Sequence, residues 1–148
     1  MKTTTKEFAN SVEAFDDYFK TNDIIFYKRE MDGEIILYLL PYRIMKKYRI
    51  DINLFVFSDS PFCRMFFKCP LNTKKDCSKR ILEINSEMDS GSLSIEPNSN
   101  TITFRIDFNI SSYSKIDSIY EAKLYACFLV YEKLFKENII KVDAANEE

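Results

Sequence analysis

The segment Tyr48–Phe57 constrains the fold more than any other part of this sequence. Large aliphatic residues occupy every second position, which places them on one side of a strand. They are Ile50, Ile52, Leu54 and Val56. Phe55 and Phe57 add apolar side chains on the opposite side, and a strand that is apolar on both sides is central or lies inside a curled sheet. We therefore expect this strand in the middle of a sheet.

Two further strands are predicted before it, joined as a hairpin. Ile24–Arg29 and Glu34–Leu40 are rich in β-branched and aromatic residues and flank the pair Asp32-Gly33. An Asp-Gly pair is among the strongest short-range hairpin signals. Pro41 is expected to end the second strand, because proline lacks the N–H that a sheet ladder needs. Tyr42–Lys47 then forms a polar connection.

Three more strands are predicted after the central one. Phe62–Lys68 follows a turn at residues 58–61. Ser92–Glu96 and Thr101–Asn109 flank a Pro-Asn-Ser-Asn turn, and apolar and polar residues alternate strictly along the second of them. This alternation predicts an antiparallel hairpin with one buried face.

Three helices are predicted around these strands. They cover residues 5–20, 74–89 and 115–138. The residues expected to cap them are Thr4 with Glu7, Thr73 with Asp76, and Ser114 with Asp117. Gly91 is expected to supply the left-handed residue that stops the second helix.

The order of these elements indicates an α+β fold. A helix, a meander of about four strands, a helix, a hairpin and a helix follow one another, and hairpin connections imply antiparallel pairing. We expect a curved antiparallel sheet of about five or six strands packed with three helices. The 148 residues suffice for one domain with its own core, which we assign to residues 1–142. The acidic residues 143–148 are expected to form a disordered, solvated tail.

The composition excludes the common catalytic templates. The chain has no His and only two Gly, so it cannot supply a Ser-His-Asp or Cys-His base, a histidine metal ligand or a glycine-rich phosphate loop. Its cysteines show neither C-x-x-C nor zinc spacing and are expected to be reduced core thiols. They are Cys63, Cys69, Cys77 and Cys127. We expect no catalytic residue, no metal site and no cofactor, and therefore no enzyme.

The sequence shows neither an export signal nor a membrane span. The N-terminal segment Met1–Asn10 is polar. The longest apolar run is Leu124–Tyr131, far shorter than the about 20 residues that cross a bilayer. These features predict a soluble, cytoplasmic protein without membrane insertion.

The middle of the chain resembles a family signature. In the segment Ile84–Ile95, Asn85 ends an Ile-Asn pair, and Gly91 follows six residues later, before an apolar strand. This pattern and the order of the elements resemble the YbjN-like family of bacterial sensory transduction regulators over nearly the whole chain. The chain departs from the family at Leu82, where members often carry Asn, and at Leu93, where an aromatic residue is common.

The resemblance implies a fold similar to the type III secretion chaperones. These are small α/β proteins that often form dimers and hold extended segments of other proteins, and the family brings no catalytic residues. We therefore expect a non-enzymatic protein-binding, chaperone-like or regulatory module. Its partner is expected to be another polypeptide or a second copy of the chain.

The predicted last helix has apolar side chains on more than one side. Its main stripe consists of Ile116, Tyr120, Leu124, Cys127, Tyr131 and Leu134. Tyr125 and Leu129 point about 100° or more away from the centre of this stripe. Exposed large apolar side chains mark interfaces, so we expect Tyr125 and Leu129 to lie in a partner or dimer interface. Burial of both under the first helix or a loop is the alternative.

Two polar residues are candidate ligand contacts. Lys123 lies on the main stripe of the last helix, where either its stem packs on the core with the ammonium at the sheet edge, or its charge faces a binding groove. The second arrangement suggests an alternative function, a small-ligand sensor that holds an anionic ligand between the sheet and the last helix. Asn85 flanks the stripe of the second helix, and its amide either bonds nearby backbone or touches a ligand.

A short basic segment has the residue types that bind nucleic acid. It consists of Arg43, Lys46, Lys47 and Arg49, interleaved with Tyr42 and Tyr48. Lys and Arg also protect sheet edges and loops, however, and the formal net charge of −2 gives no overall attraction to nucleic acid. We therefore expect no nucleic-acid partner.

Overall fold

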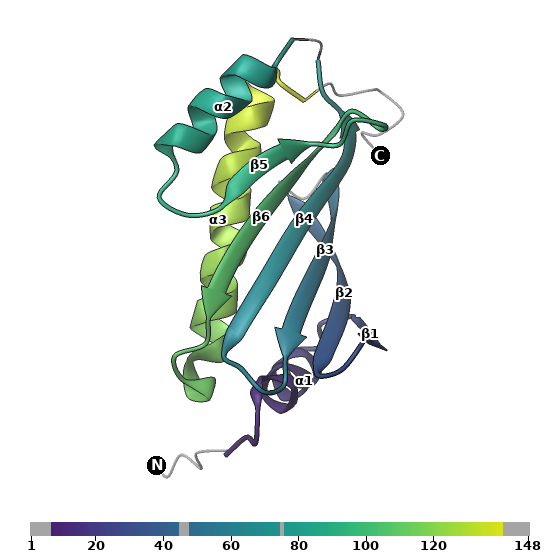
Figure 1. Cartoon of the computed structure of the whole chain (residues 1–148), viewed down its shortest axis with the longest axis vertical. Helices are drawn as coiled ribbons and strands as arrows, with labels where there is room; N and C mark the ends of the chain where they lie inside the picture. Colours follow the sequence, from purple (N-terminus) through teal and green to yellow (C-terminus); the bar gives the residue numbers. More distant parts are fainter. Residues whose placement is uncertain (1–6, 45–47, 75, 141–148) are drawn as a thin grey trace.

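The computed structural model describes residues 7–44, 48–74 and 76–140. Within them the chain forms three α-helices and a six-stranded antiparallel sheet, which confirms the predicted α+β class (Figure 1). The strands are β1 (Tyr27–Glu30), β2 (Ile35–Ile44), β3 (Tyr48–Phe57), β4 (Phe62–Asn72), β5 (Ser92–Ile95) and β6 (Thr101–Asn109). The helices are α1 (Ser11–Thr21), α2 (Ser78–Glu87) and α3 (Ile116–Lys136).

The sheet is an open, curved meander extended by a hairpin. Strands β1 to β4 pair in sequence order, and the β5–β6 hairpin adds β6 beside β4, so the order across the sheet is β1-β2-β3-β4-β6-β5. Strand β3 therefore lies between β2 and β4, as its two-sided apolar pattern predicted. In its middle, Ile52 pairs with Leu40 on one side and with Phe67 on the other.

The hydrophobic core lies between one face of the sheet and helices α1 and α3. Helix α3 runs along this face, while α1 lies at the end of the sheet near the β1–β2 and β3–β4 turns (Figure 1). The inward residues of β3 are large and apolar, and the two helices remove them from water. Ile50, Ile52, Leu54 and Val56 are 0–1% exposed, and full burial of each such side chain stabilises the fold by about 1.5–3 kcal/mol.

Helix α1 begins later than the sequence pattern predicted. Asn10 is extended, and its Oδ1 accepts a hydrogen bond from the Glu13 N–H at 3.0 Å, while the Glu13 carboxylate accepts one from the Ala9 N–H at 2.6 Å. The side-chain cap of Asn10 starts the helix at Ser11. The predicted range 5–20 is therefore wrong at residues 7–10, which are not helical, while residues 5 and 6 lie outside the described residues. Thr4, the predicted cap, lies outside the described residues.

Strand β2 continues through Pro41 to Ile44, so the predicted end at Pro41 is wrong. Tyr27, the first residue of β1, pairs with Leu39. Past Leu39 the β1 side of β2 therefore has no strand partner among the described residues. A proline can occupy such an edge, because its missing N–H removes no ladder bond there.

Helix α2 begins at Ser78, four residues after the predicted start. Thr73 forms a β-bridge with Ile140 instead of capping the helix, and Asp76 has a left-handed backbone with φ of 61°. A residue in that region cannot belong to a right-handed helix. The pairing of Thr73 with a distant segment thus overrides the local capping pattern.

Gly91 has the predicted left-handed backbone but another role. Its φ is 83°, yet α2 ends at Glu87, so Gly91 is not the residue that stops the helix. A Cβ at this position would lie 2.6 Å from the Phe104 ring and 2.9 Å from the Arg105 carbonyl oxygen. Glycine is therefore required for the close approach of the α2–β5 turn to β6.

Helix α3 follows a short 3-10 turn, Tyr113–Lys115, and matches the predicted range within two residues. The predicted caps are not used: Asp117 accepts a hydrogen bond from the Ser118 N–H at 2.7 Å, and the Ser114 hydroxyl bonds that of Ser112 at 2.9 Å. None of the described helices is both long and apolar enough to span a bilayer.

Candidate functional site

Tyr125 and Leu129 lie on the side of α3 that faces away from the sheet. Their exposed fractions are 62% and 45%, whereas Cys127, between them in the sequence, is fully buried against the sheet. The Tyr125 ring stacks on Phe128 with 6.3 Å between the ring centroids. The exposure predicted for both residues is confirmed. Their role in a partner or dimer interface stays a prediction.

Lys123 lies along the core with its charge near the end of β6. The Nζ atom is 5.3 Å from the centroid of the Phe108 ring, a cation–π distance, and the side chain is partly buried. This is the first of the two arrangements that the sequence allowed, with a stem packed on apolar surface and an ammonium that reaches the edge.

Side chains fill the space between the sheet and α3, where the alternative function places an anionic ligand. Tyr131 is fully buried, and its hydroxyl lies 2.9 Å from the Phe67 carbonyl oxygen and 3.0 Å from that of Ile102. Burial raises the pKa of Tyr131 well above its usual value, so the hydroxyl stays a neutral donor. The sensor function stays a prediction, and this packing does not favour it.

Asn85 occupies the outer edge of β5. Its Nδ2 donates to the Leu93 carbonyl oxygen at 3.0 Å, and its Oδ1 accepts from the Leu93 N–H at 2.7 Å. The amide thus takes the place of a further strand and satisfies both backbone groups of an edge residue. Of the two predicted roles, the structure shows the backbone bond.

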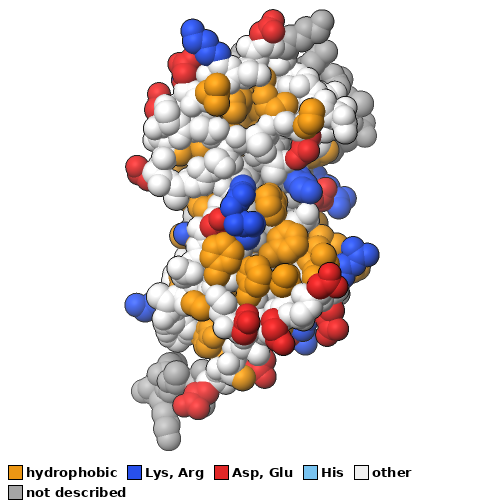
Figure 2. All heavy atoms as spheres, viewed as in Figure 1, with side chains coloured by type: hydrophobic (Ala, Val, Ile, Leu, Met, Phe, Trp, Pro, Cys, Tyr) orange, Lys and Arg blue, Asp and Glu red, His pale blue; other side chains and the backbone are white. Residues whose placement is uncertain are grey.

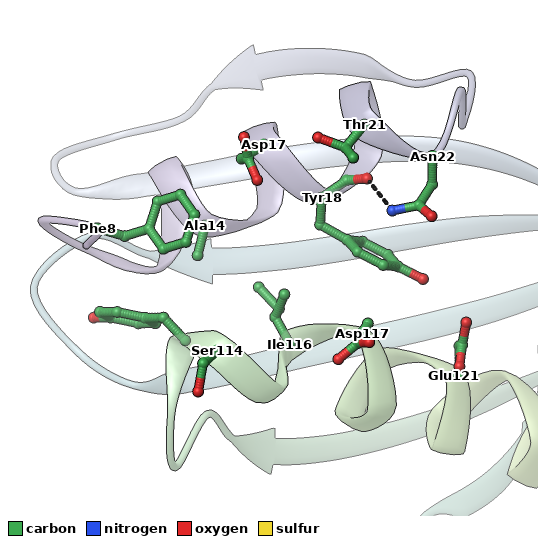
Figure 3. A pocket seen from close by; sticks show the side chains of 11 residues that line it. Phe8, Ala14, Asp17, Tyr18, Thr21, Asn22, Ser114, Ile116, Asp117 and Glu121 are labelled. Atoms are coloured by element: carbon green, nitrogen blue, oxygen red, sulfur yellow. Dashed lines mark hydrogen bonds between the residues drawn. The ribbon is translucent and has the colours of Figure 1, made fainter. Parts of the chain in front are cut away.

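A pocket of about 430 Å³ lies between α1 and the start of α3 (Figure 3). Three carboxylates line it: Asp17 from α1, and Asp117 and Glu121 from α3. The Tyr18 side chain also points into this space, and the Tyr18 carbonyl accepts a hydrogen bond from Asn22 Nδ2 at 2.8 Å. Burial raises the pKa of the Tyr18 hydroxyl, and the charges of Glu121 and Asp117 raise it further.

The acidic lining limits what this pocket could hold. Three carboxylates repel anions and attract cations. Among the described residues, however, no group of three or more His, Cys, Asp or Glu side chains is placed to hold a metal ion. We therefore assign no ligand to the pocket.

The cysteine thiols are unsuited to nucleophilic chemistry. All four are buried and unpaired, as expected. Burial raises the pKa of Cys63 to about 12, that of Cys69 to about 11, and that of Cys127 well above its usual value. A thiol that stays protonated at neutral pH is a poor nucleophile, so these side chains belong to the core.

The sheet face that points away from α1 and α3 carries a second apolar surface, which the sequence reasoning did not identify. No helix in the described part of the chain covers it, and apolar side chains gather on it (Figure 2). We call it the open face. Its exposed or partly exposed apolar side chains are Tyr27, Ile35, Leu39, Phe55, Phe57, Phe62 and Phe66. Leu37 shares the face but is only 7% exposed. Directly paired residues of antiparallel strands share a face, so the register brings these side chains together.

A groove of about 250 Å³ lies on the open face. It is lined by Met31, Asp32, Ile35, Phe55, Phe57, Arg64 and Phe66. The Phe55 and Phe66 rings meet edge to face, with 5.9 Å between centroids and 86° between planes. Sites for drug-sized molecules usually measure about 300–1,000 Å³, so this groove has the size for one or two amino-acid side chains.

Two arginines share one carboxylate beside the groove. Arg64 donates from Nε and Nη2 to the two oxygens of Asp107 at 2.8 and 3.0 Å, and Arg105 Nη2 donates to the same carboxylate at 2.9 Å. The Arg64 guanidinium also lies 5.5 Å from the centroid of the Phe62 ring. The hydrogen bonds from Arg64 and Arg105 lower the pKa of Asp107 to about 2, and the three groups together keep a net positive charge.

Part of the signal for the open face was present in the sequence. Phe55 and Phe57 stood out as apolar residues on the second side of β3, but they were interpreted only as evidence for a central strand. The strand register decides the rest, because Arg64 and Asp107 are 43 positions apart in the chain and meet only through the β4–β6 pairing.

No family model matches this chain, and no curated protein matches it. The resemblance to the YbjN-like family therefore depends on the segment 84–95 and the order of the elements, and stays a hypothesis.

Proposed function

We propose that this protein is a non-catalytic protein-binding module that pairs with a second copy of itself through the outer side of α3. The observation that carries this proposal is the exposure of Tyr125 and Leu129, one turn apart on a helix whose other side lies in the core. Burial of a large apolar side chain against a partner stabilises the complex by about 1.5–3 kcal/mol. A pair of such side chains is a ready contact for another protein surface.

The outer side of α3 has the residue spacing of a helix-pairing surface. Its residues follow alternating steps of four and three positions, as in a heptad: Ser118, Ala122, Tyr125, Leu129, Glu132 and Lys136. We call this row the α3 seam. Its first two side chains, Ser118 and Ala122, are small, and its last two, Glu132 and Lys136, are long. A two-fold axis that passes between Tyr125 and Leu129 places the small end of one copy opposite the long end of the other, with Tyr125 and Leu129 of both copies at the centre.

We also propose that the protein is cytoplasmic, and further observations support this location and the non-catalytic role. The chain has no His to act as a general base, and the buried Cys63, Cys69 and Cys127 hold protonated thiols. Four unpaired cysteines are usual in a reducing compartment. The resemblance to a family with chaperone-like folds and frequent dimers agrees with the same function.

Light scattering coupled to size-exclusion chromatography tests the pairing. One helix pair buries less than about 1,200 Å², the class of weak and transient interfaces. The measured mass of the wild type is therefore expected to rise with protein concentration from 17.5 kDa toward twice that value. Leu129→Asp buries a charge at the centre of the seam, and we expect it to keep the mass at that of one chain at every concentration.

Leu82→Asp is the matched control. Leu82 is 69% exposed on α2 and lies outside the seam, so this substitution is expected to leave the concentration dependence unchanged. A wild type that stays at 17.5 kDa up to the highest soluble concentration contradicts the proposal. A dimer that Leu129→Asp does not weaken contradicts it as well.

A further inference from the structure

We infer that the open face binds an extended polypeptide segment in which a large apolar side chain is accompanied by Asp or Glu residues. The apolar side chain occupies the groove between Phe55, Phe57 and Phe66, and the carboxylates of the segment face Arg64 and Arg105. This surface lies on the other side of the molecule from the α3 seam. The inference therefore holds whether or not the chain pairs with a second copy.

The groove supplies the anchor of this interaction. Its volume of about 250 Å³ and its ring-lined walls suit a Leu, Met or aromatic side chain. Phe55, Phe57 and Phe66 are only partly buried, and Met31 at the rim is 41% exposed. An apolar side chain inserted into the groove removes the exposed parts of all four side chains from water at once. Fully desolvated pockets of this kind are typical of binding hot spots.

The charge of the open face selects an acidic segment. The outward positions of the strands carry six basic side chains: Arg29, Arg43, Arg49, Arg64, Lys68 and Arg105. They carry two acidic ones, Asp51 and Asp107. The face thus has a surplus of positive charge, although the whole chain has a formal net charge of −2. Such a separation steers partners of opposite charge to one face.

The charges also give the segment a direction. In Figure 2, Lys and Arg side chains border one side of the apolar patch, and Asp and Glu side chains gather at its opposite end. Asp32 lines the groove from the β1–β2 turn, while Arg64 lines it from β4. The carboxylates of the bound segment therefore lie toward β4 and β6, and away from the β1–β2 turn.

The edges of the sheet are poor sites for strand addition, so the segment is held by side chains of the face. Strand β1 is four residues long and fully exposed, and it carries the charged run Lys28, Arg29 and Glu30. Short, charged edge strands discourage pairing with another chain. At the other edge, Asn85 already bonds both backbone groups of Leu93.

A polypeptide fits this surface better than a nucleic acid does. Base stacking needs ring faces that are free on a flat platform, but Phe55 and Phe66 pack edge to face and border a groove. The aliphatic side chain of Ile35 lines the same groove, and Arg64 and Arg105 already bond a carboxylate, the group that an acidic peptide presents. Each guanidinium has five N–H donors, so N–H groups that Asp107 does not use can donate to a further carboxylate.

Selection from a displayed library of random linear peptides tests the inference, with the full chain as bait. We expect the selected peptides to combine a large aliphatic or aromatic residue with neighbouring Asp or Glu. A synthetic, fluorescein-labelled copy of the most enriched peptide is then titrated with the wild type by fluorescence polarisation. Its affinity is expected to fall as salt increases, because salt screens the arginine and lysine contacts.

Two substitutions locate the site. Met31→Asp places a charge at the groove rim, and Lys68→Glu reverses a charge on the exposed part of the face. Each substitution is expected to lower the affinity for the labelled peptide about tenfold or more. Both positions are exposed, so the fold is expected to persist, which circular dichroism checks. The matched controls are Leu82→Asp on α2 and Lys20→Glu on α1, both expected to leave peptide affinity unchanged.

The outcomes separate this inference from the proposed function. Peptide binding that survives Leu129→Asp but is lost in Met31→Asp supports the open face, whatever the oligomeric state. The inference is overturned by a library that yields no enriched peptide, by enriched peptides that are basic, or by equal binding to wild type, Met31→Asp and Lys68→Glu. It is also overturned if an oligothymidylate displaces the labelled peptide from the protein and binds the protein more tightly than the peptide does.

Discussion

The two faces of the sheet are made by the same strands and have different chemistry. On β3, the inward residues Ile50–Val56 at alternate positions are 0–1% exposed and all aliphatic. The outward residues of the same strand include Arg49, Asp51 and Asn53 beside two phenylalanines. The central strands β3, β4 and β6 place no charged side chain on the inner face. On the open face, charged and apolar side chains share each of the strands β1 to β4.

This difference shows which residues serve the fold and which are left for function. The inner face meets the requirement of every core, because burial under α1 and α3 leaves no place for an unpaired charge. No helix among the described residues covers the open face, so its aromatic side chains gain little from the fold and need another explanation. Substitutions on the two faces are therefore expected to separate stability from binding.

Leu54→Ala against Phe55→Ala is the sharpest form of this comparison, because the two residues are neighbours on β3 and point to opposite faces. Leu54 is 0% exposed, so its truncation leaves a cavity, and we expect a loss of about 3 kcal/mol in the free energy of unfolding. Phe55 is partly exposed, and its truncation is expected to cost about 1 kcal/mol, although more atoms are removed. Urea denaturation with both midpoint and slope determined measures the two values.

The reverse order of these two losses would show that the open face is part of the core. An equal loss in both variants leads to the same conclusion. Affinity for the selected peptide provides the complementary measurement. Phe55→Ala is expected to lower this affinity, and Leu54→Ala is not.

A second comparison uses the two tyrosines on opposite sides of α3. The Tyr131 hydroxyl is the buried donor near the carbonyl oxygens of Phe67 and Ile102. Tyr131→Phe leaves both carbonyls without this partner, and we expect a loss of about 1–2 kcal/mol in the free energy of unfolding. Tyr125→Phe, on the exposed side, is expected to change it by less than about 0.5 kcal/mol. Thermal unfolding followed by circular dichroism compares the two, and equal losses contradict the assigned sides.

The elements that the sequence predicted well are those whose pattern is local. The ranges of β3 and β6 follow directly from strict alternation at Tyr48–Phe57 and Thr101–Asn109, and the range of α3 follows from its apolar stripe. The errors lie where a distant segment decides. Thr73 pairs with Ile140 instead of capping α2, and Pro41 continues β2 because β1 covers only part of its edge.

The candidate sites show the same difference between features that one segment determines and features that depend on distant segments. The wheel of α3 was enough to place Tyr125 and Leu129 away from the main stripe and Lys123 on it, because one helix fixes these angles. Whether a second element buries Tyr125 and Leu129 could be read only from the structure, where both are exposed. The groove could not be predicted, since Met31, Phe55 and Arg64 come from separate strands and turns. Their distance in space depends on the sheet register, which no single segment encodes.

The smallest expected effect concerns Asp107, whose charge holds the two arginines beside the groove. Its pKa of about 2 lies below the value of about 3.9 for an unfolded chain, so the folded state binds the proton more weakly than the unfolded state. The stabilisation is therefore complete above about pH 4 and is lost as the pH falls through about 2. Because the groups are partly exposed, with 32–44% of each side chain accessible, we expect Asp107→Asn to cost less than about 1 kcal/mol at neutral pH.

Urea denaturation of the wild type and Asp107→Asn from pH 7 down to pH 2 measures this effect. The difference between the two proteins is expected to shrink between about pH 4 and pH 2, because the wild-type carboxyl becomes protonated there. Asp51→Asn is the control, since Asp51 bonds only Arg49 among the pairs described and is more exposed. A difference that persists unchanged at pH 2 contradicts the assigned arginine pairing. A loss of several kcal/mol contradicts the distinction between the faces, because it makes Asp107 as important to the fold as the buried residues behind it.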